Sequence, residues 1–142
     1  MQKIAAVAFA LLLVLHGLVH FIGTLVYMQL APIGVLPYET ALLGGRWELH
    51  DYGMQFFGAL WVVPAVGFVL AGVALLAGRR LWIPLVVGTT PVSLVMTVLD
   101  LGAAYRGAVL NVLILATVWL IPILRSRLST HDGARHPTTR CS

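Results

Sequence analysis

Four long runs of apolar residues divide this chain, and short polar or glycine-containing segments separate them. The runs cover residues 4–30, 52–77, 81–99 and 108–124. A helix needs about 20 apolar residues to cross the hydrocarbon layer of a membrane, and helices satisfy their backbone hydrogen bonds there without water. The pattern therefore predicts an all-α membrane protein with four transmembrane helices, of which the last is the shortest.

Short connections predict how these helices are arranged. The turns around residues 78–80 and 102–107 are tight, so consecutive helices should be antiparallel neighbours in an up-down four-helix transmembrane bundle. Two small residues, Gly58 and Gly72, lie seven positions on either side of Ala65. A stripe of small residues allows another helix to approach closely, so it predicts a helix contact, either inside the bundle or between copies of the chain.

The longest connection, residues 31–51, is expected to lie at the outer surface of the membrane. Pro37 is well placed to begin a short helical turn over residues 38–43, which Gly44 and Gly45 would end. The apolar side chains of this segment would rest on the membrane surface. It is interpreted as an interfacial connector, with a lid over an outward-facing site as the alternative.

Composition and charge agree with membrane insertion and predict the orientation. Hydrophobic residues make up 60% of the 142 positions and charged residues 10%, whereas a soluble domain carries roughly 25% charge. Basic residues gather on one side of the predicted bundle: Lys3, Arg79, Arg80, Arg125, Arg127, Arg135 and Arg140, against Arg46 and Arg106 on the other. Because positive charge favours the cytoplasmic side, both termini are expected in the cytoplasm.

The chain is accordingly divided into a transmembrane domain, residues 1–124, and a basic cytoplasmic tail, residues 125–142. The tail lacks apolar periodicity and is expected to be disordered. Its arginines would be attracted to anionic lipid. Nucleic acid is not an expected partner, because the basic residues follow the membrane topology and do not form a face.

Polar side chains within the spans are concentrated in their outer halves. His16 and His20 lie one helical turn apart in the first run, and polar residues of the other three runs lie at similar depth. Ionisable groups at membrane depth normally face a partner or a cavity. If the polar faces converge, they form a pocket open toward the outer side and lined by His16, His20, Gln55, Ser93, Thr97, Asp100 and Asn111.

The histidine pair has several interpretations. Spacing of four places both imidazoles on one helix face, as in metal sites that other helices complete, so His16 and His20 are candidate metal or haem ligands. They are also candidates for binding or proton transfer, or for structural hydrogen bonds to neighbouring helices. Asp100 would either pair with Arg106 across the turn or turn inward and accept a hydrogen bond from His20.

Three segments resemble a family of small, uncharacterised bacterial four-span integral membrane proteins. They are HGLVHFIGTLVY at 16–27, LPYETALLGGRW at 36–47 and GAVLNVLIL at 107–115. The likeness covers most of residues 4–124 and excludes the tail. The resemblance implies a multi-pass protein of the bacterial inner membrane and assigns no activity or functional residues.

Three classes of function follow from these residues. The favoured one is a non-enzymatic binding or accessory module whose outer pocket accepts a lipid-like or quinone-like molecule or a partner subunit; a second copy of the chain is a further candidate partner. The second is an enzyme acting on a lipid or isoprenoid, with His20 and Asp100 as acid and base. The third is a metal- or haem-binding membrane subunit that uses His16 and His20.

Overall fold

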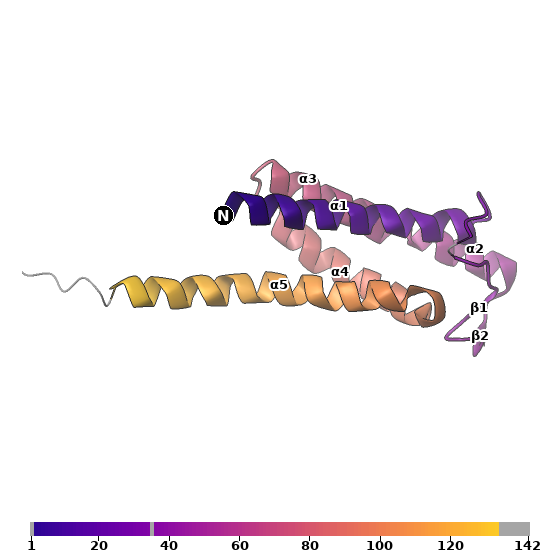
Figure 1. Cartoon of the computed structure of the whole chain (residues 1–142). Helices are drawn as coiled ribbons and strands as arrows, with labels where there is room; N and C mark the ends of the chain where they lie inside the picture. The colour runs from indigo at the N-terminus through magenta and orange to yellow at the C-terminus, as the bar shows by residue number, and fades with distance from the viewer. Residues whose placement is uncertain (1, 35, 134–142) are drawn as a thin grey trace, which may run out of the picture.

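The computed structural model of the chain describes the backbone of residues 2–34 and 36–133 and the side chains of residues 3–34 and 36–120. Helices account for 76% of the structure, and the remainder includes one small hairpin. The elements are α1 (Gln2–Tyr27), β1 (Ala41–Leu42), β2 (Trp47–Glu48), α2 (His50–Leu60), α3 (Val62–Leu76), α4 (Trp82–Leu99) and α5 (Leu101–Gly133), as Figure 1 shows.

Within the described residues, four helical segments are long and apolar enough to cross a membrane, as the hydrophobic pattern predicts. They are Lys3–Tyr27, His50–Leu76, Trp82–Leu99 and Leu101–Leu120. The second combines α2 and α3, which meet at Trp61. Pro64 falls in the first turn of α3, where a residue without a backbone N–H is tolerated, so the proline explains why the helix is interrupted at this point.

The last helix differs from its predicted bounds at both ends. It begins at Leu101 in place of residue 108, and it bends at Ala104, whose φ of −108° and ψ of 15° are not helical. Its backbone also remains helical through Gly133, whereas disorder was expected from residue 125. Residues 125–132 contain no glycine or proline to end the helix. Residues 134–142 of the predicted tail lie outside the described part of the chain.

The long connection forms a β-hairpin, so the predicted helical turn over residues 38–43 is wrong. Ala41 pairs with Glu48 and Leu42 pairs with Trp47 in antiparallel register. Gly44 and Gly45 have φ values of 65° and 86°, which glycine adopts without a steric cost, so they turn the chain back on itself. Leu42 is buried against the bundle, and the N–H of Leu43 donates to the carbonyl of Leu99 over 2.8 Å.

The stripe of small residues on the second span faces α1. A Cβ added at Gly72 would lie 2.6 Å from Cγ2 of Val14, and one added at Gly58 would lie 2.8 Å from Cβ of Tyr27. On α1, a Cβ at Gly17 would lie 2.7 Å from the carbonyl oxygen of Ala65. The small residues therefore serve a close helix contact inside the bundle, and the α1–α3 interface is its most extensive one.

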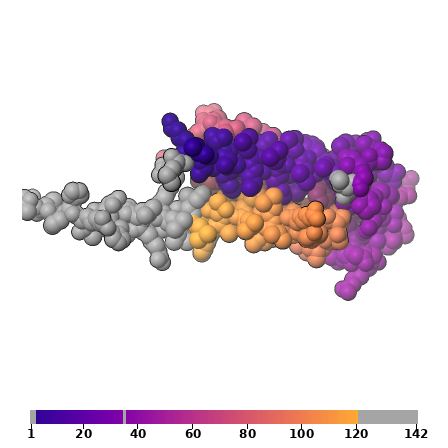
Figure 2. All heavy atoms as spheres, in the orientation of Figure 1, coloured from indigo at the N-terminus to yellow at the C-terminus, as the bar shows by residue number. Residues whose placement is uncertain are grey.

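The bundle is open along one edge. Helix α1 packs on α3, α3 packs on α4, and α4 packs on α5, but α1 and α5 form no comparable interface among the described residues. Figure 1 shows α1 and α5 lying roughly side by side in front of α3 and α4, and Figure 2 shows the face that they share. The hairpin lies at the end of the bundle where α1 ends and α5 begins, which we call the hairpin end.

Candidate ligand-binding site

The two histidines occupy the interior of the bundle. Their spacing of four on α1 places the rings on one face, with centroids 4.6 Å apart. The His16 ring contacts Phe68 edge-on at 4.7 Å, and the His20 ring contacts Trp61 edge-on at 5.2 Å. His16 is 4% exposed and His20 is 2% exposed. Two aromatic side chains of the second span therefore hold the imidazole pair in place.

A hydrogen-bond network joins both histidines to the third and fourth spans. Nε2 of His16 donates to Oδ1 of Asn111 over 2.9 Å, and Nε2 of His20 shares a hydrogen bond of 2.6 Å with Oγ of Ser93. Nδ2 of Asn111 donates to Oγ of Ser93 over 2.8 Å and lies 3.4 Å from Oγ1 of Thr97. The network links three helices that are distant in the sequence, because buried polar groups in an apolar interior need partners.

The structure thus brings together five of the seven residues for which a shared pocket is predicted: His16, His20, Ser93, Thr97 and Asn111. Ser93 and Asn111 are completely buried, and the network satisfies them. Of these five residues, His16, His20 and Thr97 also line the groove described below.

Gln55 does not join this cluster. Its side chain is exposed, because Met54, Phe57 and Gly58 form the buried face of α2 and residue 55 points away from them. Gln55 also lies six residues, about 9 Å, nearer the hairpin end than Trp61, which contacts His20.

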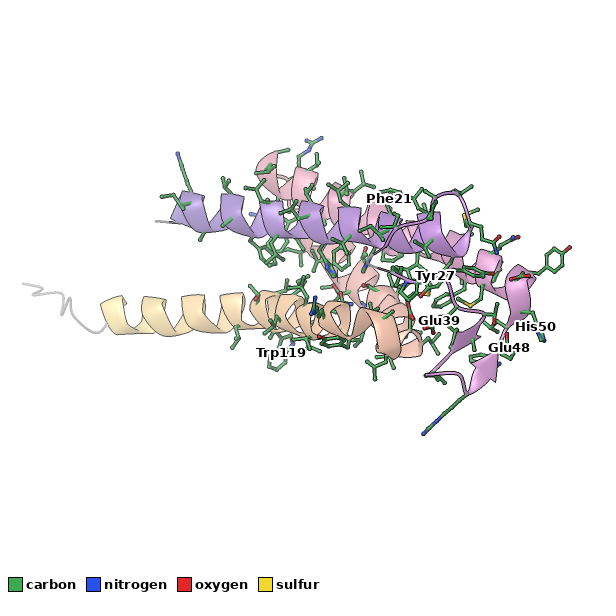
Figure 3. The ribbon with its side chains drawn as sticks, turned by 45° about the vertical axis from the view of Figure 1, so that its right-hand side comes forward. Phe21, Tyr27, Glu39, Glu48, His50 and Trp119 are labelled. Carbon is green, nitrogen blue, oxygen red and sulfur yellow. The ribbon has the colours of Figure 1, made fainter. Side chains whose placement is uncertain are left out.

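Asp100 is buried at the hairpin end and binds a different partner from those expected. The hydroxyl of Tyr27 donates to Oδ2 of Asp100 over 2.5 Å, and His20 is engaged by Ser93. No ion pair joins Asp100 to Arg106 in the described part of the chain. Burial raises the pKa of Asp100 to about 6. The hydrogen bond from Tyr27 opposes this rise, and the charge of Glu39 adds a smaller contribution to it. Tyr27 and Glu39 lie at this end of the molecule in Figure 3.

A groove of about 710 Å³ runs along the open edge between α1 and α5. Its extent on α1 is from Ala8 to Gly23, about 22 Å at 1.5 Å per residue. Its lining is mostly apolar. The lining also includes Trp61, the polar residues His16, His20 and Thr97, and the charged residue Arg106. Small-molecule sites have similar volumes, predominantly apolar walls and a few polar groups that orient the ligand.

Three buried polar atoms near the histidine pair have no hydrogen-bond partner within the described residues. They are Nδ1 of His20, Oγ1 of Thr24 and Nε1 of Trp61. Thr24 follows His20 by one helical turn, and Trp61 covers His20 and Gly23. A buried polar group without a partner costs about 1–3 kcal/mol. All three atoms are covered by surrounding side chains, so a molecule lying in the groove does not contact them directly.

The donor set at the histidine pair does not fit a metal site. No group of three His, Cys, Asp or Glu side chains suited to a metal ion occurs among the residues that the structure describes. Both Nε2 atoms are also engaged by Asn111 and Ser93. A tetrahedral metal site needs three or four protein ligands, and this pair supplies two.

Ser93 and His20 have the spacing of a nucleophile and a base, but their surroundings do not favour catalysis. Ser93 is 0% exposed and does not line the groove. None of the described residues offers Nδ1 of His20 a carboxylate that would orient the ring. The Ser93 hydroxyl therefore acts here as a structural link between helices.

No family model, curated protein or solved structure matches this chain. The groove adds residues that the polar pattern alone does not single out, above all Trp61. The sequence pattern pointed to Trp61 only indirectly. Trp61 and Phe68 follow the small residues Gly58 and Ala65 by three positions, so they lie beside the stripe that contacts α1.

Proposed function

We propose that this chain is a multi-pass protein of a bacterial inner membrane that binds one lipid-like or quinone-like molecule in the groove between α1 and α5. The observation that carries the proposal is the groove itself, which runs along the open edge of the bundle and has polar groups in a mostly apolar wall. With the helices in a bilayer, this edge faces the hydrocarbon layer, from which an amphipathic molecule can enter sideways.

A small amphipathic molecule fits this groove better than a helix of a partner subunit does. An apolar helix would face the side chain of Arg106 with no polar group, whereas a molecule with a polar end and an apolar chain would contact Arg106 and fill the walls. The volume of about 710 Å³ lies within the range of about 300–1,000 Å³ that is typical of small-molecule sites. Binding requires no chemical step, so the histidines act as hydrogen-bonding groups.

Photolabelling in nanodiscs tests this proposal. The probes are phosphatidylcholine and phosphatidylglycerol with the same diazirine-bearing acyl chain, and a diazirine-bearing quinone analogue. We expect at least one probe to label the 8–23 and 103–110 segments at low mole fraction, and the labelling should saturate. Labelling that rises linearly with mole fraction for all three probes would show that the groove is only part of the lipid-facing surface.

Two neighbouring residues of α1 provide a matched pair of variants. Val19 is 56% exposed and lines the groove, whereas Leu18 is 50% exposed and does not. Val19→Trp should fill the groove and reduce saturable labelling at least fivefold, and Leu18→Trp should leave it unchanged. Equal labelling of the two variants would contradict the proposed site.

A further inference from the structure

Arg106 lies at the hairpin end of the groove, where no other described lining residue carries a charge. It is the only charged side chain among the seventeen residues that line the groove. No carboxylate lies within ion-pair distance of its guanidinium in the described part of the chain. The carboxylate that the sequence places nearest, Asp100, is held by Tyr27.

The guanidinium keeps most of its hydrogen-bonding capacity. Among the described residues, its one hydrogen bond runs from Nε to the Tyr105 hydroxyl over 3.0 Å. Its central carbon also lies 5.5 Å from the centroid of the Tyr105 ring. Guanidinium has five N–H donors, so the terminal nitrogens remain available for a ligand while Tyr105 steadies the side chain.

The position of Arg106 matches the place of a head group. It precedes Asn111 by five residues on α5, which places it about 7.5 Å nearer the hairpin end than Asn111, the partner of His16. The apolar part of the groove continues in the opposite direction to Ala8. A molecule whose chain fills the groove therefore brings its head to the guanidinium.

We propose that the ligand of this groove is an anionic amphiphile whose phosphate or carboxylate is bound by Arg106. The inference rests on the proposed function and adds the charge of the ligand. Arginine binds both groups through two parallel hydrogen bonds, which a lysine ammonium does not reproduce. A cation in a groove with no acidic side chain also disfavours a cationic ligand, because nothing in the lining would neutralise it.

The experiment compares head groups that share one diazirine-bearing acyl chain, in nanodiscs of unlabelled phosphatidylcholine at pH 8. The probes are phosphatidylcholine, which is zwitterionic, phosphatidylglycerol, which carries an anionic phosphate, and the fatty acid, which carries a carboxylate. We expect phosphatidylglycerol or the fatty acid to saturate the groove at a mole fraction at least tenfold lower than phosphatidylcholine. Whichever of the two is favoured identifies the source of the anionic group.

Three variants assign the preference to the guanidinium. Arg106→Gln should abolish the preference for the anionic probe, and Arg106→Lys should retain part of it. Arg46→Gln removes an exposed arginine of the hairpin that does not line the groove and should change nothing. Circular dichroism and gel filtration confirm that each variant is folded.

The outcomes separate this inference from the proposed function. Saturable labelling by phosphatidylcholine as strong as that by the anionic probes would overturn the inference and leave the groove as a lipid site. An anionic preference that survives in Arg106→Gln would also overturn it. Saturable labelling by the quinone analogue of the first experiment alone would overturn the inference and leave the proposed function standing. Absence of saturable labelling by all four probes would overturn both proposals.

Discussion

The contact between α1 and α3 provides a sharp test of the packing described above. In Gly17→Ala, the new Cβ would lie 2.7 Å from the carbonyl oxygen of Ala65 and 3.0 Å from the backbone nitrogen of Val69. Both atoms belong to the backbone of α3, so a change of rotamer cannot relieve the clash. The two helices must separate along their most extensive interface.

The expected magnitude follows from a comparison with Gly88→Ala. A Cβ at Gly88 meets no other atom within 4 Å, so this variant gains only the greater helix propensity of alanine, up to about 1 kcal/mol. Gly17→Ala has the same gain but adds a methyl group to a filled interface, which costs about 1–3 kcal/mol. Because the propensity gain cancels in the comparison, Gly17→Ala should be less stable than Gly88→Ala by about 1–3 kcal/mol.

Unfolding in mixed micelles measures this difference. The wild type, Gly17→Ala and Gly88→Ala are titrated with sodium dodecyl sulfate, and the unfolding transition is followed by tryptophan fluorescence and far-ultraviolet circular dichroism. Equal transition midpoints for Gly17→Ala and Gly88→Ala would refute the close approach of α1 and α3. A Gly88→Ala variant that is strongly destabilised would refute the outward orientation of that face of α4.

Three further predictions concern the polar residues. Asn111→Leu leaves N–H of His16 and the hydroxyl of Ser93 without the amide between them, so the same titration should show a loss of about 1–3 kcal/mol; no loss would contradict the network. Burial raises the pKa of Asp100 from 3.8 to about 6, so the folded state holds this proton more tightly than the unfolded chain does. The stability that this group contributes is therefore full below about pH 4 and lost as the pH rises through 6. Thermal unfolding of wild type and Asp100→Asn between pH 4 and 8 should show this loss only in the wild type. Melting temperatures of the two proteins that change in parallel with pH would exclude this contribution of Asp100. Gln55→Leu should change the free energy of unfolding by less than about 0.5 kcal/mol, since the side chain is exposed; a larger loss in the micelle titration would place Gln55 in a contact.

The sequence by itself determined the number of membrane-length helical segments and the position of each polar group along them. A run of about 20 apolar residues must be helical in a membrane, and a rise of 1.5 Å per residue fixes how far along the helix each side chain lies. The depths of His16, His20, Ser93 and Asn111 therefore followed from residue numbers alone. So did the small-residue stripe, because a repeat of seven keeps Gly58 and Gly72 on one helix face.

The rotation and neighbours of each helix were decided only by the tertiary structure. Depth along an axis is a local property, but rotation about that axis depends on packing against helices that are far away in the sequence. This is why Gln55 turns away from the bundle, and why Asp100 binds Tyr27 in place of His20 or Arg106. The groove exists because α1 packs on α3 and leaves its edge toward α5 open, an arrangement that depends on close contacts at Gly17 and Gly72 and that no single helix specifies.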